Sequence, residues 1–160
     1  MIVVADTAPI NYLVLIQEID LLPKLYGEVA IPQAVLHELL ASRSPEPVRM
    51  WVENRPAWVR VEQVSGEAFT ETAEFLDAGE REAIALARAI RAKLLIIDER
   101  AGRREALRLN LPVTGTLGVL LAASTRGIIE LHPVLDRLRR TSFYLPANLI
   151  ENLMRDPQRP

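Results

Sequence analysis

Four acidic residues stand where the sequence allows their side chains to meet in space: Asp6, Glu38, Glu82 and Asp98. Asp6 and Asp98 each follow a short run of apolar, mostly β-branched residues, which is typical of a strand buried on both faces. Ligands of an open parallel sheet bind outside the carboxyl ends of its strands. Asp6 and Asp98 are therefore candidates for one site at that edge.

Glu38 and Glu82 border apolar stripes on expected helices. Glu38 lies among Val35, Leu36, Leu39 and Leu40, and Glu82 has Ala85, Leu86 and Ala89 at i+3, i+4 and i+7. A glutamate beside a core stripe is uncommon unless it is paired or binds a metal. Glu80 is a competing candidate, although the helix dipole also explains an acid in a first turn.

Such a cluster of acids needs protons or a cation. Two unit charges ~4 Å apart repel by ~4 kcal/mol at an effective dielectric of 20. Oxygen donors alone favour Mg²⁺ or Mn²⁺, and with no cysteine and two histidines the chain offers little for zinc. The simpler alternative for Asp6 or Asp98 taken alone is a helix cap, which contributes ~1 kcal/mol.

The elements that must position these acids alternate between strands and helices. The expected strands are Ile2–Ala5, Val29–Ile31, Trp58–Val64, Leu94–Ile97 and Pro112–Thr114. Helices are expected near Pro9–Ile16, over Pro32–Leu40, Val48–Asn54, Glu80–Ala92 and Glu99–Leu109, from Gly115 to about Ser124, and twice more after that. This order predicts an α/β fold, a three-layer α/β/α sandwich around a central parallel sheet.

Length and composition predict one globular domain. The chain has 160 residues, of which 49% are hydrophobic and 25% charged, and its net charge is −2. We expect a single domain over residues 1–160, with C-terminal helices at about 130–154 packed on it. An apolar run long enough for a membrane helix and a basic leader are both missing, so we expect a cytoplasmic protein with no membrane contact.

Arginine dominates the basic residues. Lys24 and Lys93 are the only lysines, and arginines crowd the stretch from Arg81 to Arg108. The guanidinium fork suits phosphate oxygens. A solvated helix face with local ion pairs is the alternative, and charge alone favours it.

Five motifs, in this order and spacing, resemble those of the PIN-domain nucleases, particularly the small prokaryotic branch with the VapC-type toxins of toxin–antitoxin pairs. They are Val4–Ile10, Val29–Pro32 with Val35 and Glu38–Leu39, Leu76–Ile84, Leu94–Arg100, and Gly115–Gly118. The resemblance covers nearly the whole chain.

The resemblance implies an endoribonuclease that hydrolyses RNA phosphodiester bonds with one or two Mg²⁺ or Mn²⁺ ions. The family's four catalytic, metal-binding acids fall on Asp6, Glu38, Glu82 and Asp98, with Asp6 and Asp98 as the main ligands. The implied partners are an RNA substrate, an antitoxin protein and a second copy in a homodimer. The candidate substrate-binding residues are Thr7, Arg100, Arg103 and Thr116, although Thr116 is equally a helix cap. Glu99 only partly fills the place of a further acid that many relatives carry.

Other classes fit less well. A phosphotransfer enzyme of the haloacid dehalogenase type needs a second aspartate where this chain has Ala8. A receiver domain needs paired acids after its first strand and a late lysine, whereas Thr7 follows Asp6 and no lysine follows Lys93. The remaining alternative is a catalytically silent PIN-like module that binds RNA or protein, and the presence of all four acids argues against it.

Overall fold

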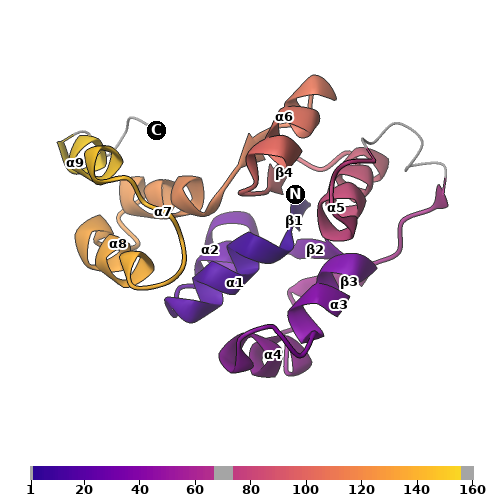
Figure 1. The fold of residues 1–160 in the computed structure, drawn as a ribbon, viewed down its shortest axis with the longest axis horizontal. Helices are drawn as coiled ribbons and strands as arrows, with labels where there is room; N and C mark the ends of the chain where they lie inside the picture. Colours follow the sequence, from indigo (N-terminus) through magenta and orange to yellow (C-terminus); the bar gives the residue numbers. More distant parts are fainter. Residues whose placement is uncertain (1, 67–73, 156–160) are drawn as a thin grey trace.

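A five-stranded, all-parallel sheet forms the centre of the computed structural model, which describes residues 2–66 and 74–155 (Figure 1). Its spatial order is β3-β2-β1-β4-β5. The strands are β1 (Val3–Ala5), β2 (Val29–Pro32), β3 (Val59–Glu62), β4 (Leu94–Ile96) and β5 (Val113–Thr114). With helices on both faces, the predicted three-layer α/β/α sandwich is confirmed.

The strand order reverses beside β1. The chain runs outward from β1 through β2 to β3, and then returns to place β4 on the other side of β1. Such a reversal opens a crevice at the carboxyl ends of the two central strands, where open α/β sheets bind ligands. Asp6 follows β1, and Asp98 comes two residues after the end of β4.

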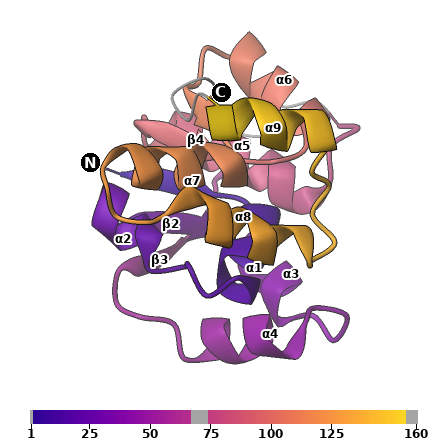
Figure 2. The same ribbon diagram turned by 90° about the vertical axis from the view of Figure 1, so that its left-hand side faces the viewer.

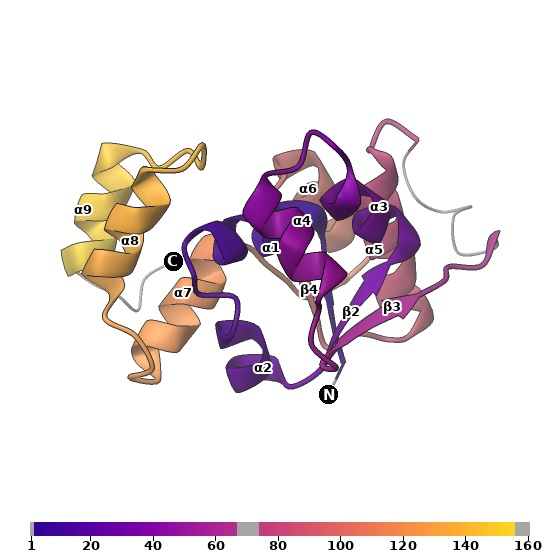
Figure 3. The same ribbon diagram turned by 90° about the horizontal axis from the view of Figure 1, so that it is seen from below.

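Alternate residues of each central strand serve opposite core layers. Val3 and Ala5 pack with the apolar faces of α1, α2, α4, α7 and α8, whereas Val4 packs with α5 and α6. Figure 3 shows α5 and α6 on the far side of the sheet from α1 and α4. The nine helices that the described residues form are α1 (Thr7–Leu15), α2 (Leu21–Tyr26), α3 (Gln33–Leu40), α4 (Glu46–Glu53), α5 (Ala78–Ala89), α6 (Arg100–Arg108), α7 (Thr116–Thr125), α8 (Leu131–Arg139) and α9 (Ala147–Arg155).

The C-terminal helices lie at one end of the molecule. Figure 2 shows α8 and α9 beside α7, on the side away from β3. Arg137 of α8 donates to the carbonyl of Ile16 and pairs with Glu18 at 2.6 Å, which ties α8 to the chain just after α1. Among the residues described, none of the helices combines the length and apolar character that a bilayer span requires.

Two elements differ from the expectation. The short helix α2 was not predicted, because six residues with a proline in the third position give too brief a pattern to recognise. Helix α5 begins at Ala78 rather than at Glu80, because Asp77 caps it: the backbone N–H of Glu80 donates to Oδ1 of Asp77 at 2.8 Å.

Candidate active site

Asp6 is buried at the carboxyl end of β1, with 4% of its surface exposed. Its backbone N–H donates to the carbonyl of Ile96 at 2.9 Å, so the β1–β4 ladder fixes the position of its backbone. It occupies the N-cap position of α1, yet its side chain makes no capping hydrogen bond. Within the described part of the chain, Oδ1 of Asp6 is buried without a hydrogen-bond partner. The helix-cap alternative therefore does not account for this aspartate.

Glu38 is held by residues from two other helices. The hydroxyl of Thr7 donates to Oε2 of Glu38, and the backbone N–H of Gly79 donates to Oε1 at 3.2 Å. An added Cβ at Gly79 would lie 2.8 Å from Cδ of Glu38, so the missing side chain leaves room for that carboxylate. The starts of α1 and α5 thus meet around the carboxylate that α3 supplies.

Glu80 is the most deeply buried acid on α5, with 6% of its surface exposed. It is the third residue of the helix and follows the capping residue Asp77 by three positions. That arrangement resembles a capping box, in which the side chain of a glutamate three residues after the N-cap accepts a hydrogen bond from the backbone N–H of the capping residue.

A cavity of about 390 Å³ opens between these acids. Its walls come from the start of α1, from α3, from the loop between α3 and α4, and from the starts of α5 and α6. The lining residues are Asp6, Thr7, Ala8, Asn11, Tyr12, Glu38, Arg43, Ser44, Pro45, Asp77, Glu80 and Glu99. Five of these twelve are acidic, which is an unusual concentration of one charge around a small volume.

The acids perturb one another. The pKa of Asp6 is raised to about 8, mainly by burial and to a smaller extent by the negative charges of Asp77, Glu38 and Glu80, while hydrogen bonding by the backbone of Thr7 opposes the rise. Burial likewise raises the pKa of Glu80 to about 7, and Asp77 contributes again. At neutral pH the cavity without a cation therefore holds protons on groups that are ordinarily ionised.

Asp98 lies against an adjoining cavity of about 650 Å³, which shares Ala8, Tyr12 and Glu99 with the first. Thr116 donates a hydrogen bond to each carboxylate oxygen of Asp98, one from its backbone N–H and one from its hydroxyl. Burial raises the pKa of Asp98, while the hydrogen bonds from Thr116 and the positive charge of Arg103 lower it.

A comparison with models of protein families matched residues 2–158 to a family described as a PIN domain. The chain belongs to the PIN-domain family. Members of this family are generally nucleases, and they generally use divalent metal ions. Searches of curated proteins and of solved structures returned no match.

In this PIN domain the structure brings Asp6 and Glu38 to one cavity, and on α5 it places Glu80 there rather than Glu82. Positions two apart on an α-helix lie about 200° apart around its axis. Glu80 and Glu82 therefore point to different sides of α5. Glu82 does not line this cavity, and its role as a site residue stays a prediction. Asp98, the fourth expected acid, reaches the neighbouring cavity instead.

Glu82 faces α3. Burial raises the pKa of its carboxylate, and the negative charge of Glu38 adds to the rise, whereas the backbone N–H of Ala34 and the charge of His37 oppose it. Ala34 is in the first turn of α3, whose N-cap, Pro32, offers no capping side chain. Glu82 thus supplies from a neighbouring helix the acceptor that the N-terminus of α3 lacks.

The expected substrate-binding residues divide into two groups. Thr116 is fully buried and holds Asp98, and Thr7 holds Glu38, so both position acids rather than present a free hydroxyl. Arg100 and Arg103 line the cavity beside Asp98.

Sequence reasoning missed Asp77 and Arg43 altogether. The run Asp77–Glu80 carries a recognisable signal, since an aspartate followed three residues later by glutamate marks a helix start. Arg43 gave no such signal, because it lies in a polar loop that reaches the cavity only through the packing of α3 on α4.

The donor atoms of the cavity suit a divalent cation. Asp6, Glu38, Asp77, Glu80 and Glu99 offer oxygens alone, which are the ligands of Mg²⁺ and Mn²⁺. Oδ1 of Asp6 is an acceptor without a donor, as a ligand awaiting a cation would be. In the described parts of the chain no three acids or histidines are already grouped at coordinating positions, so binding requires rotation of side chains such as Glu38 or Glu80.

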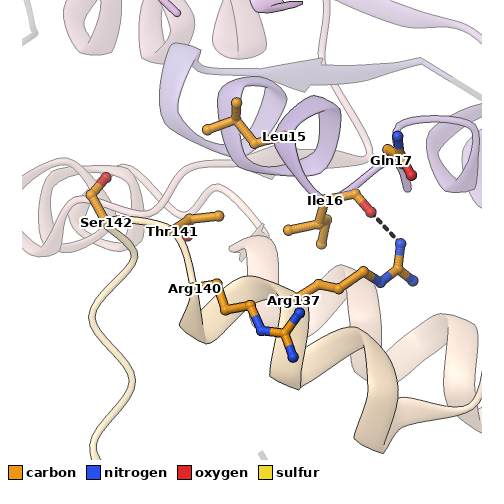
Figure 4. Close-up of a pocket in the computed structure, with 7 residues that line it drawn as sticks. All are labelled: Leu15, Ile16, Gln17, Arg137, Arg140, Thr141 and Ser142. Carbon is orange, nitrogen blue, oxygen red and sulfur yellow. Dashed lines mark hydrogen bonds between the residues drawn. The ribbon is translucent and has the colours of Figure 1, made fainter.

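A third cavity, of about 420 Å³, lies between α8 and the residues that follow α1 (Figure 4). It is lined by Leu15, Ile16, Gln17, Arg137, Arg140, Thr141 and Ser142, none of which is acidic. Figure 4 shows Arg137 directed at the carbonyl of Ile16. With Arg137 engaged in joining α8 to α1 and no acid in the lining, this cavity offers no metal ligands.

Proposed function

We propose that this protein is a metal-dependent endoribonuclease that hydrolyses RNA phosphodiester bonds in the acidic cavity. The buried carboxylate of Asp6, with one oxygen unpaired and opening on a cavity of four further acids, carries this proposal. A divalent cation bound there would polarise a phosphate and lower the pKa of a coordinated water. The proposed ligands are Asp6, Glu38 and Glu80, with Asp98 at the border of the neighbouring cavity.

The chain's own residues prepare this cavity. Thr7 and the N–H of Gly79 hold Glu38, and Thr116 holds Asp98, so two carboxylates are oriented before any ligand arrives. Arg43 is the one basic residue among those that line the acidic cavity, and its guanidinium could contact a phosphate oxygen as charge develops there. Binding of a cation there would release the protons of Asp6 and Glu80 to the solvent.

The test measures binding and cleavage separately. Mg²⁺ or Mn²⁺ should raise the melting temperature of the wild type, because a ligand that binds the folded state stabilises it. Asp6→Asn should lose most of that rise. The wild type should cut a fluorescent RNA only with metal, and Asp6→Asn should not cut it. A wild type that shows neither a shift nor cleavage would support the silent module instead.

We further propose that the enzyme is the toxin of a toxin–antitoxin pair, working in the cytoplasm. The family resemblance supports this role, and the cavity supplies an entry for an antitoxin segment. Expression of the wild-type chain should slow bacterial growth, whereas Asp98→Asn, expressed at the same level, should not. Equal growth of both strains would favour a processing nuclease.

A homodimer is part of the same proposal. The apolar segments 117–123 and 145–154 are its candidate interface, and Leu117 and Leu121 of α7 are only partly buried by the chain's own core. Light scattering would establish the oligomeric state.

A further inference from the structure

The cavity beside Asp98 carries a combination of side chains that the chemistry of hydrolysis does not require. Apart from Asp98 and Glu99, its lining includes two arginines, three aromatic residues and two leucines. These are Arg100, Arg103, Tyr12, Phe143, Tyr144, Leu117 and Leu149. The arginines come from α6, whereas Phe143 and Tyr144 come from the segment between α8 and α9.

That segment is fixed against α1. The hydroxyls of Tyr12 and Ser142 are hydrogen-bonded at 3.0 Å, and the rings of Tyr12 and Phe143 meet edge to face with their centroids 5.0 Å apart. Tyr144 follows directly, and 83% of its surface is exposed. An anchored backbone therefore presents an aromatic ring that the described part of the chain leaves exposed.

The two arginines offer positive charge in the same cavity. Arg103 lies close enough to lower the pKa of Asp98. Arg100 is exposed, and within residues 2–66 and 74–155 its side chain makes no ion pair or hydrogen bond. A guanidinium without a carboxylate partner is available for a phosphate.

We propose that this cavity is the binding track for a single-stranded nucleic acid segment next to the cleavage site. Arg100 and Arg103 contact its backbone phosphates, and Tyr144 stacks on one base. The chemistry favours this occupant because exposed aromatic rings and arginines together match the alternating bases and phosphates of a single strand. Continuity supports it as well, since the cavity shares Ala8, Tyr12 and Glu99 with the acidic cavity.

This inference rests on the proposed function for the position of the cleavage site, but its test does not depend on cleavage. Binding of a fluorescein-labelled single-stranded RNA is measured by anisotropy in EDTA at fixed salt. Tyr144→Ala should weaken binding about 5- to 100-fold, the range that the loss of one stacked base produces. Tyr144→Phe keeps the ring and should bind as the wild type does.

Phe75→Ala is the matched control, because Phe75 is 74% exposed and lines neither cavity. An RNA of the same length with abasic sites identifies the base as the partner: the Tyr144→Ala effect should vanish on it. Arg100→Ala should weaken binding of both RNAs and flatten the salt dependence.

The outcomes separate this inference from the proposed function. If the wild type bound RNA but did not cut it with metal, the proposed RNA-binding track would still hold, whereas the proposed nuclease activity would be wrong. Cleavage with an unchanged KM in Tyr144→Ala, or equal losses in Phe75→Ala, would overturn the track alone. Failure of the wild type to bind any single strand, with a protein partner captured at this surface instead, would also overturn it.

Discussion

Thr116 donates to both carboxylate oxygens of Asp98, from its backbone N–H to Oδ1 at 2.7 Å and from its hydroxyl to Oδ2 at 2.6 Å. Thr116 is the first residue of α7, so the same contact satisfies an N–H that the helix leaves free. One residue thus joins the end of β4 to the start of α7 and orients an acid beside the cavity.

Thr116→Val should destabilise the fold by about 1–2 kcal/mol, because Oδ2 of Asp98 loses its donor while the shape of the side chain is kept. Urea unfolding measures this loss. Thr116→Ser restores the hydroxyl and should recover most of it. If serine and valine behaved alike, the hydroxyl contact would not matter for stability.

Glu80→Gln and Glu82→Gln should have different effects, although the residues are two positions apart. Glu80 lines the acidic cavity, so Glu80→Gln should reduce the metal-induced rise in melting temperature and lower cleavage at least ~10-fold. Glu82→Gln should leave both nearly unchanged and cost only some stability, since Glu82 serves the N-terminus of α3. Calorimetric titration with Mn²⁺ compares the two variants directly.

The reverse ranking of these variants would show that Glu82, rather than Glu80, is the ligand, as the resemblance implies.

Gly79→Ala should weaken metal binding even though alanine favours helices. Replacing glycine inside a helix ordinarily gains up to ~1 kcal/mol. Here the new methyl group would meet the carboxyl group of Glu38, which must then leave its position. We expect a smaller metal-induced shift and lower activity in a protein that still folds. Gly66→Ala is the control, because an added Cβ there meets nothing within 4 Å; matching behaviour of the two variants would contradict the steric argument.

The sequence was sufficient for the sheet and for its two central acids. The apolar runs before Asp6 and Asp98 identify buried parallel strands, and parallel strands bring their carboxyl ends to one edge. It was not sufficient to choose between Glu80 and Glu82. Both belong to α5, and only the packing of that helix against α3 and the sheet determines which of them lines the cavity.

The cavity beside Asp98 could not be predicted from the pattern along the chain. It depends on the return of the segment after α8 to α1, where Ser142 meets Tyr12 across 130 positions. Local periodicity carries no information about a contact over that separation. The sequence therefore predicted C-terminal helices near 130–154, but it did not predict that Phe143 and Tyr144 line one cavity with Arg103.

The last prediction concerns pH. The pKa of Asp6 is about 8 in the folded protein, against an ordinary value of 3.8. Between these values the folded state holds a proton that the unfolded state has lost. Stability of the metal-free protein is therefore highest below pH ~4 as far as Asp6 is concerned, and it falls as the pH rises toward 8, by at most ~1.4 kcal/mol per pH unit for one proton.

Asp6→Asn should remove much of this fall in stability with pH, and it should be more stable than the wild type at pH 8 in EDTA. A smaller fall should remain, because Glu80 has a pKa of about 7. Urea unfolding from pH 5 to pH 8.5 measures both proteins, and Asp20→Asn, an exposed acid outside the cavities, should follow the wild type. Because a cation displaces the proton from Asp6, Mn²⁺ affinity should rise over the same interval. If the free energy of unfolding changed with pH in the same way in the wild type and in Asp6→Asn, Asp6 would be ionised in the folded protein. The acids of the cavity would then not be neutralised by protons.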